Sequence, residues 1–208
     1  AGAGAHGPAQ RRDQDVRAPD LHLLRKCPVP VWILNGPAAP RSARVMAAVD
    51  PDPDDPVRDA LARMVLQLAA SLARQDAARL DVMHTWTLPE EAALSHGLIS
   101  IPQGEVDAIL EAERLATGRR LDRLLTHFSD SEDTMRVLHI KGLADDAIPD
   151  HVESEGIDTL VMGTLGRTGI TGYFIGNTAE TILNRVECSG LAVKPRGLVS
   201  PVLPGVAA

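Results

Sequence analysis

Short apolar runs that alternate with helical apolar patterns constrain the fold of this chain more than any other feature. Between the runs, apolar residues recur at helical spacing over 54–76, 105–128, 145–154 and 178–186. The runs themselves have the length of buried strands and cover residues 43–49, 80–86, 135–140, 159–163 and 191–194. This alternation predicts an α/β fold, a five-stranded parallel, doubly wound, Rossmann-like sheet with helices on both faces.

A second short helix and strand precede this regular pattern. Residues 20–34 predict a helix followed by a strand, and the proline-rich residues 36–40 predict a linker. The stretch from His22 to Cys27 resembles the stretch from Thr181 to Cys188, and each precedes a predicted strand. We therefore expect three parts: a remnant of a preceding related domain with its linker (1–36), the main domain (37–195) and a C-terminal tail (196–208).

Composition excludes several classes of protein. The 208 residues carry a formal net charge of -7, and aromatic residues make up 2% of them. An acidic chain with few aromatic residues is a poor candidate for nucleic-acid binding, which needs a basic face and stacking platforms. The sequence shows neither a membrane-spanning run nor a signal peptide pattern, and its two cysteines lack metal spacing, so we expect a cytoplasmic protein.

A glycine-rich loop between a predicted strand and a predicted helix carries the clearest chemical signal. Gly163-Thr164-Leu165-Gly166 is followed, after nine residues, by Gly176-Asn177-Thr178-Ala179-Glu180. Asn177 and Glu180 match a capping box, so we expect Asn177 to cap the helix and the following amides to face a phosphate. Arg167 lies in the loop and would add positive charge. Such turns also occur without a ligand, so both interpretations stay open at this point.

Asp50 follows the first strand of the main pattern, and Gly163 ends the fourth. The carboxyl ends of parallel strands meet at one edge of a sheet, where such folds bind their ligands. We therefore expect Asp50 and Gly163 to share a cleft. The loop is neither a P-loop nor a dinucleotide fingerprint, because the residues that define those motifs are absent.

The spacing G-x-x-G, nine residues, then G-[ST] resembles the ATP-site pattern of the universal stress protein family. Gly163, Gly166 and Gly176 fit that pattern, and the similarity extends over residues 42–195, including Val193-Lys194-Pro195. Residues 22–31 are similar to the last helix and strand of the first half in the tandem-domain, E-type subgroup. The chain thus looks most like the C-terminal half of such a protein.

The resemblance implies a stress-response regulatory module on a sheet like that of adenine nucleotide alpha hydrolases. It implies ATP as a possible ligand, accompanied by magnesium if bound. It assigns a cofactor-binding role to Asp50 at the ribose or adenosine end, the backbone near Thr85 at the adenine, Gly163 beneath the ribose, and Gly166, Gly176, Asn177 and Thr178 around the phosphates. It also implies a homodimer, or a pseudo-dimer, through terminal edge strands: residues 191–194 pair with a twin or are covered by residues 29–34.

Asn177 departs from this pattern, because the family has Ser or Thr after the last glycine. The alternative is a protein that keeps the fold as an interaction or scaffold module and binds no nucleotide. The sequence presents no catalytic base and no metal-ligand set, so we expect no enzymatic activity beyond slow ATP hydrolysis at most.

Overall fold

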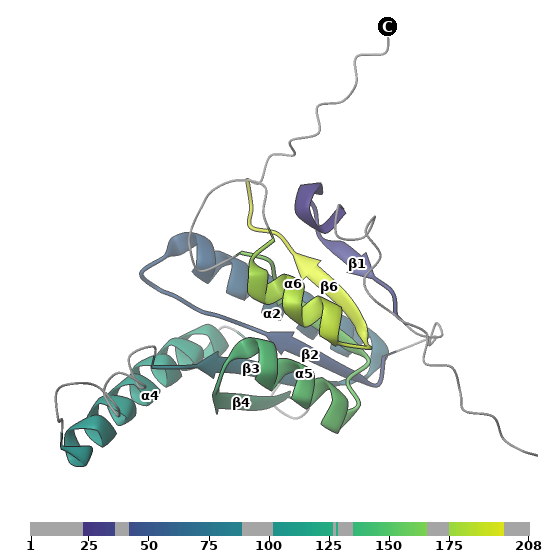
Figure 1. Ribbon diagram of the computed structural model, residues 1–208. Helices are drawn as coiled ribbons and strands as arrows, with labels where there is room; N and C mark the ends of the chain where they lie inside the picture. Colours follow the sequence, from purple (N-terminus) through teal and green to yellow (C-terminus); the bar gives the residue numbers. More distant parts are fainter. Residues whose placement is uncertain are drawn as a thin grey trace, which may run out of the picture.

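A six-stranded sheet covered by helices on both faces forms the centre of the molecule (Figure 1). The computed structural model describes residues 23–35, 42–88, 102–126, 128, 135–165 and 175–197. The elements in chain order are β1 (Val31–Ile33), β2 (Arg44–Ala48), α2 (Pro56–Asp76), β3 (Arg79–Trp86), α4 (Gln103–Leu125), β4 (Met135–Lys141), α5 (Ala144–Glu155), β5 (Thr159–Gly163), α6 (Asn177–Arg185) and β6 (Ser189–Val193). No helix among these is both long and apolar enough to cross a membrane.

The strand order is β1-β6-β5-β2-β3-β4. The last five strands of this order are parallel, as the alternating pattern predicts. The expectation of a five-stranded, purely parallel sheet is nevertheless wrong, because β1 adds a sixth, antiparallel strand. Val31 lies opposite Ala192, and Ile33 lies opposite Gly190. The edge formed by β6 is therefore covered by the segment that the sequence assigns to a preceding domain.

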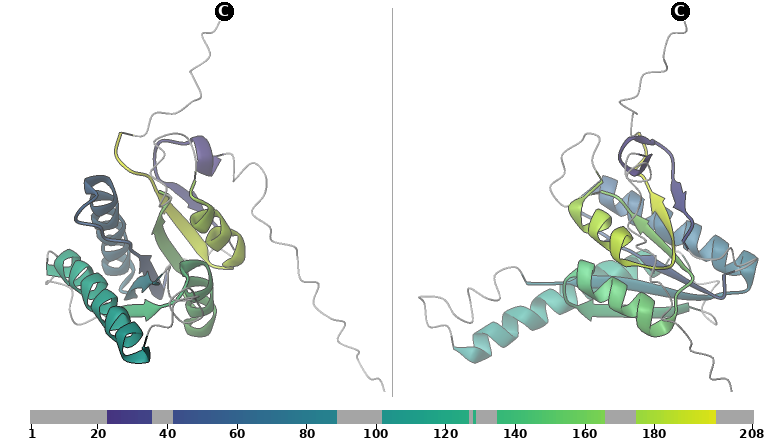
Figure 2. Two further views of the ribbon diagram at one scale, coloured as in Figure 1. Left: turned by 60° about the vertical axis from the view of Figure 1, so that its left-hand side comes forward. Right: turned by 45° about the vertical axis from the view of Figure 1, so that its right-hand side comes forward.

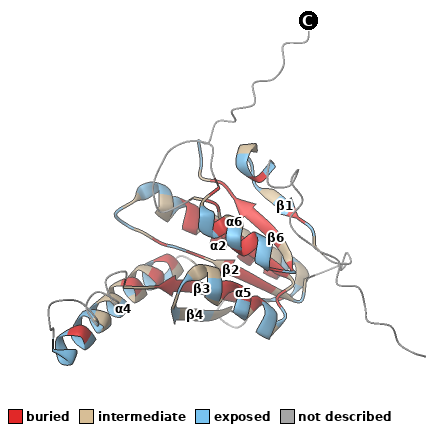
Figure 3. Ribbon diagram, viewed as in Figure 1, coloured by how far each residue is buried: buried red, intermediate tan, exposed pale blue. Residues whose placement is uncertain are grey.

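Two separate hydrophobic cores cover the two faces of the sheet, because alternate strand residues point to opposite sides. In β2, Val45 and Ala47 belong to the core under α2 and α4, and Met46 belongs to the core under α5 and α6. The left view of Figure 2 shows α2 and α4 on one side of the sheet and α5 and α6 on the other. The expected helices on both faces are confirmed, and Figure 3 shows that the buried residues concentrate where helices and sheet meet.

Helix α2 shows how local sequence sets the element that borders the site. The carboxylate of Asp55 accepts hydrogen bonds from the amides of Val57 (3.0 Å) and Arg58 (3.2 Å), and Pro56 occupies the first helical position. Both features favour a helix start at this point. The buried residues of α2 lie on one stripe: Leu61, Ala62, Val65, Leu66, Ala69, Ala70 and Ala73.

Helix α5 contains Pro149 at its sixth position, beyond the first turn in which a helix tolerates proline. A proline there removes the amide that would bond to the carbonyl of Asp145. The guanidinium of Arg185, at the end of α6, donates to that carbonyl and also to the carboxylate of Asp146. Arg185 thus satisfies the acceptor that Pro149 leaves and ties α6 to α5.

Candidate functional site

A cleft opens where the chain changes direction across the sheet, between the carboxyl ends of β2 and β5. From β2 the chain proceeds to β3 and β4 on one side, then returns to β5 and β6 on the other. Parallel sheets bind ligands at this switch point. The cleft encloses about 1030 Å³, counting the solvent at its open mouth. Most of its wall is apolar, and its polar and charged residues are Asp50, Arg58, Thr85, Thr87, Asp145 and Thr178.

Asp50 lies at the mouth of the cleft, two residues after the end of β2, in an ion pair with Arg58. One terminal nitrogen of the Arg58 guanidinium donates to a carboxylate oxygen of Asp50 at 2.5 Å. The other terminal nitrogen donates to a carboxylate oxygen of Asp52 at 2.6 Å. The cap at Asp55 places Arg58 in the first turn of α2, from which it reaches back over residues 50–52. Burial of the guanidinium alone would lower the pKa of Arg58. The carboxylates of Asp50 and, to a lesser extent, Asp52 outweigh this effect and raise the pKa above its ordinary value.

Thr85 lies near the end of β3, buried and on the wall of the cleft. It faces Ile140 in β4, and the carbonyl of the next residue, Trp86, accepts the amide of Gly142 at 2.9 Å. Gly142 has a φ of 153°, which favours glycine, and begins the turn into α5. The strand end where the resemblance puts the adenine therefore forms one wall of the cleft.

Gly163 ends β5 and is backed by a side chain from α2. A Cβ built at this position would lie 2.8 Å from Cδ2 and 3.1 Å from Cγ of Leu61, closer than such atoms approach in proteins. Both residues line the cleft. Gly163 therefore allows α2 to pack against the end of β5, and this contact explains the glycine without any ligand.

The amino end of α6 borders the cleft through Thr178 and Ala179. Gly176 is the N-cap of this helix, and its amide donates to the carbonyl of Thr164 at 2.9 Å. Thr164 is itself fixed, since its amide and hydroxyl both donate to the carbonyl of Val193. The amides of Asn177, Thr178 and Ala179 occupy the first helical positions, where an α-helix provides no acceptor of its own.

The prediction that Asn177 caps α6 in a capping box with Glu180 is wrong. Asn177 is already the first helical residue, and the cap at Gly176 makes no side-chain hydrogen bond. This shift puts Glu180 at the fourth helical position, whereas the box requires the third. The carboxylate of Glu180 instead accepts two hydrogen bonds from Arg25, at 2.7 and 2.9 Å. The Asn177 side chain is exposed and has no role in the cap.

The structure brings four of the predicted site residues to one cleft: Asp50, Thr85, Gly163 and Thr178. Gly176 and Asn177 directly precede Thr178 in the chain without lining the cleft. Gly166 and Arg167 lie outside the described residues. Sequence reasoning missed Arg58 and Leu61. For Arg58 a signal was present, because Asp55 and Pro56 favour a helix start, which places Arg58 in the first turn of α2.

A second group of charged residues lies at the opposite ends of the strands. Asp81 is buried and accepts hydrogen bonds from Arg136 (2.7 Å) and His151 (2.8 Å), and Arg136 also reaches Glu155. Burial alone would raise the pKa of Asp81, but the bonds from Arg136 and His151 hold it below its ordinary value. This group links β3, β4 and α5. In the described ranges no three residues of the types His, Cys, Asp and Glu form a potential metal site.

Comparison with protein families gives one match, to a model described as the universal stress protein family, over residues 42–194. Among curated proteins, universal stress protein E of Salmonella typhi is 31% identical over 186 residues, which cover 88% of this chain and 56% of that protein. A universal stress protein E homolog of Haemophilus influenzae is 26% identical over 85% of this chain and 55% of that protein. The chain thus spans about half the length of the curated relatives it matches.

Solved structures share the fold. A protein of unknown function from Pseudomonas aeruginosa PAO1 matches with a TM-score of 0.69 at 23% identity, over 93% of this chain and 62% of that one. Universal stress protein UspA from Lactobacillus plantarum matches with a TM-score of 0.57 at 16% identity, over 76% of this chain and all of that one (100%). At these identities the matches establish the α/β architecture alone.

Proposed function

Because the chain belongs to the universal stress protein family, we propose that it is a stress-response regulatory module that binds an adenine nucleotide, ATP foremost, in the cleft described above. One observation carries the proposal. The cleft lies at the switch point of the sheet and is bordered by Asp50, Gly163 and the amino end of α6. A ribose needs hydrogen-bonding partners and a phosphate needs backbone amides or positive charge, and this arrangement supplies both kinds of group within one cleft.

We propose a role for each residue from its place in the cleft. Asp50, held by Arg58 at the mouth, is the proposed partner of the ribose, and the end of β3 at Thr85 is the proposed wall for the adenine. The amides of Asn177, Thr178 and Ala179 would receive the phosphates. Gly176 adds no free amide, because its own is bonded to Thr164. Gly166 and Arg167 remain sequence-based candidates for the phosphate end.

ATP binding is tested on the purified full chain. We expect nucleotide to be released on denaturation, or a titration with ATP at millimolar concentration to show saturable binding. Asn177→Ser restores the hydroxyl of the family pattern and should tighten binding by about tenfold, the effect of one hydrogen bond to a charged group. Asn184→Ser is the matched control, an exposed Asn at the other end of the same helix.

A native chain that binds no nucleotide in either assay would refute the proposal. If Asn177→Ser creates ATP binding where the native chain has none, the alternative of a family member that keeps the fold as an interaction module is the better account. A general loss of structure does not produce this pattern, because it would remove binding rather than create it.

For residues 1–36 we propose the end of a preceding, related domain. Residues 23–26 are helical, β1 pairs with the edge strand β6, and the segment exposes large apolar side chains that a further domain would cover. The exposed fractions are 54% for Leu23, 58% for Val29, 47% for Trp32 and 74% for Leu34. Since β1 already occupies the edge of β6, we expect light scattering to show no dimer that depends on β6. A dimer abolished by proline substitutions in β6 would argue for homodimer pairing instead.

A further inference from the structure

Residues 23–35, which precede the main domain, contact helix α6. The first residues of α6 border the proposed phosphate end of the cleft. Leu24 is fully buried and belongs to the same core as Ala179 and Ile182 of α6. The carbonyl of Leu24 accepts a hydrogen bond from the ammonium group of Lys194, which is buried at the end of β6. The segment 23–35 is therefore seated firmly enough to hold its side chains in defined positions beside α6.

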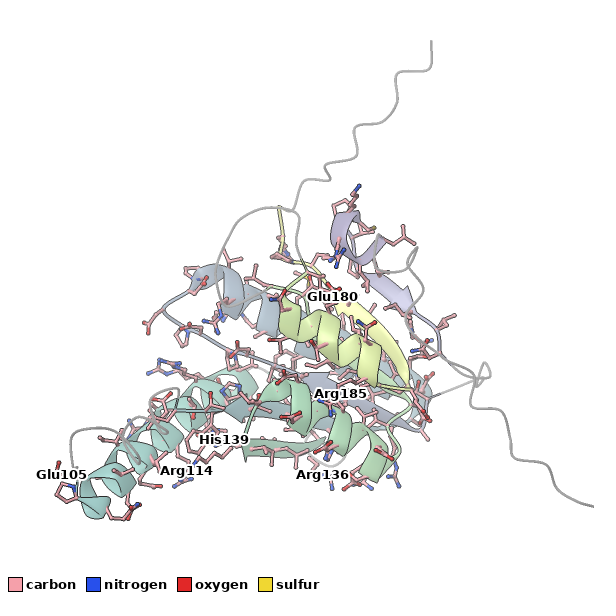
Figure 4. All side chains as sticks on the ribbon, viewed as in Figure 1. Glu105, Arg114, Arg136, His139, Glu180 and Arg185 are labelled. Carbon is pink, nitrogen blue, oxygen red and sulfur yellow. The ribbon has the colours of Figure 1, made fainter. Side chains whose placement is uncertain are left out.

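One of these side chains forms an ion pair with α6. The guanidinium of Arg25 donates to both carboxylate oxygens of Glu180, at 2.7 and 2.9 Å. Figure 4 shows Glu180 on α6, beside the helical turn formed by residues 23–26. Both bonds come from one terminal nitrogen of the guanidinium, and hydrogen bonds between two ionised groups are stronger than those between neutral ones. The pair joins residues 155 positions apart in the chain.

Glu180 occupies a position that matters for an anion at the start of α6. It lies one residue after Ala179 and four residues, about 6 Å along the helix axis, after Gly176. A carboxylate in the first turn of a helix is stabilised by the helix dipole, and it repels a second anion that binds there. A partner cation cancels that repulsion, because the pair has no net charge.

We propose that Arg25 controls the affinity of the cleft for the phosphate groups of its ligand by neutralising Glu180. The segment before the domain then regulates the site, because movement of residues 23–35 away from α6 exposes the Glu180 carboxylate to the phosphates. This inference rests on the nucleotide-binding function proposed above. Arg25 is a positioning residue, since it acts through Glu180 and does not line the cleft.

Titration calorimetry of the full chain with ATP, ADP and adenosine tests the proposal. We expect Arg25→Ala to weaken ATP binding by about fivefold, ADP binding by less, and adenosine binding not at all, because the repulsion scales with ligand charge. The double variant Arg25→Ala/Glu180→Gln should regain the affinity of the native chain, because the unpaired carboxylate is gone. Arg114→Ala is the control: it removes an exposed Arg–Glu pair on α4, and neither residue of that pair lines the cleft.

The outcomes separate this inference from the function on which it rests. If the native chain binds none of the three ligands, both fail together. If the native chain binds ATP and Arg25→Ala binds it equally well, the inference alone fails. It also fails if Arg25→Ala weakens adenosine as much as ATP, or if Glu180→Gln does not restore binding, because Arg25 then acts by holding the fold. Raising the salt concentration should shrink the ATP effect, as expected for a screened charge.

Discussion

Substitution of Gly163 by alanine tests how closely α2 approaches the end of β5. The added Cβ would lie 2.8 Å from Cδ2 and 3.1 Å from Cγ of Leu61, a side chain only 6% exposed. Overpacking of this kind costs about 1–3 kcal/mol. Because Leu61 borders the cleft, it can relax toward open space, so we expect a value near the lower end, about 1.5 kcal/mol. For a chain of this size that corresponds to a melting temperature lower by about 3–6 °C.

Urea unfolding followed by circular dichroism measures this loss, and a double-mutant cycle assigns its cause. In a Leu61→Ala background the clash is absent, so Gly163→Ala should then cost almost nothing, leaving a coupling energy of about 1.5 kcal/mol. Gly104→Ala is the control, because a Cβ at Gly104 in α4 meets no atom within 4 Å and should leave stability unchanged or raise it. Equal stability of Gly163→Ala and the native chain, or strictly additive effects with Leu61→Ala, would refute the packing argument.

Two further predictions concern titratable groups. Burial raises the pKa of Cys188 to about 11, so iodoacetamide at pH 8 should label the more accessible Cys27 first; equal labelling rates would contradict this. Burial, and then Arg114, lower the pKa of His139 below the ordinary 6.5, so the unfolded chain takes up the proton first and stability falls as pH drops below about 6.5. His139→Gln should flatten the unfolding free energy between pH 7.5 and about 5.5, while the separate loss that comes from Asp81 remains at lower pH.

The fold was predictable from sequence because its signals are local. Apolar runs and helical periods depend on neighbouring residues, so the positions of the five parallel strands and four helices of the main domain follow from them. Residues 29–34 were also predicted as a strand, and β1 is shorter, Val31–Ile33, after two prolines that cannot donate to a ladder. Its antiparallel position beside β6 depends on contacts about 160 residues apart, which no local pattern encodes.

The site was predictable in part for the same reason. Asp50 and Gly163 converge because parallel strands end at one edge, a rule of topology. The capping assignment failed by one residue, since the start of α6 is set by the distant bond from Gly176 to Thr164. The clamp of Arg58 on Asp50, and the fit of Leu61 against Gly163, depend on side-chain packing in three dimensions.

The spacing of glycines in the sequence predicts where the cleft lies, but no single side chain predicts its ligand. The charges of the described part of the cleft explain this difference. Its basic side chain among the described residues, Arg58, is already held by two carboxylates, and the whole chain is acidic. An anion at α6 would therefore depend on backbone amides and the helix dipole, which any residue supplies. The spacing of glycines in the sequence indicates this backbone geometry. The affinity for an anion depends in addition on the charged side chains around the backbone amides. Under the two proposals, the pair of Arg25 and Glu180, which lies outside the cleft, would decide how strongly phosphate binds.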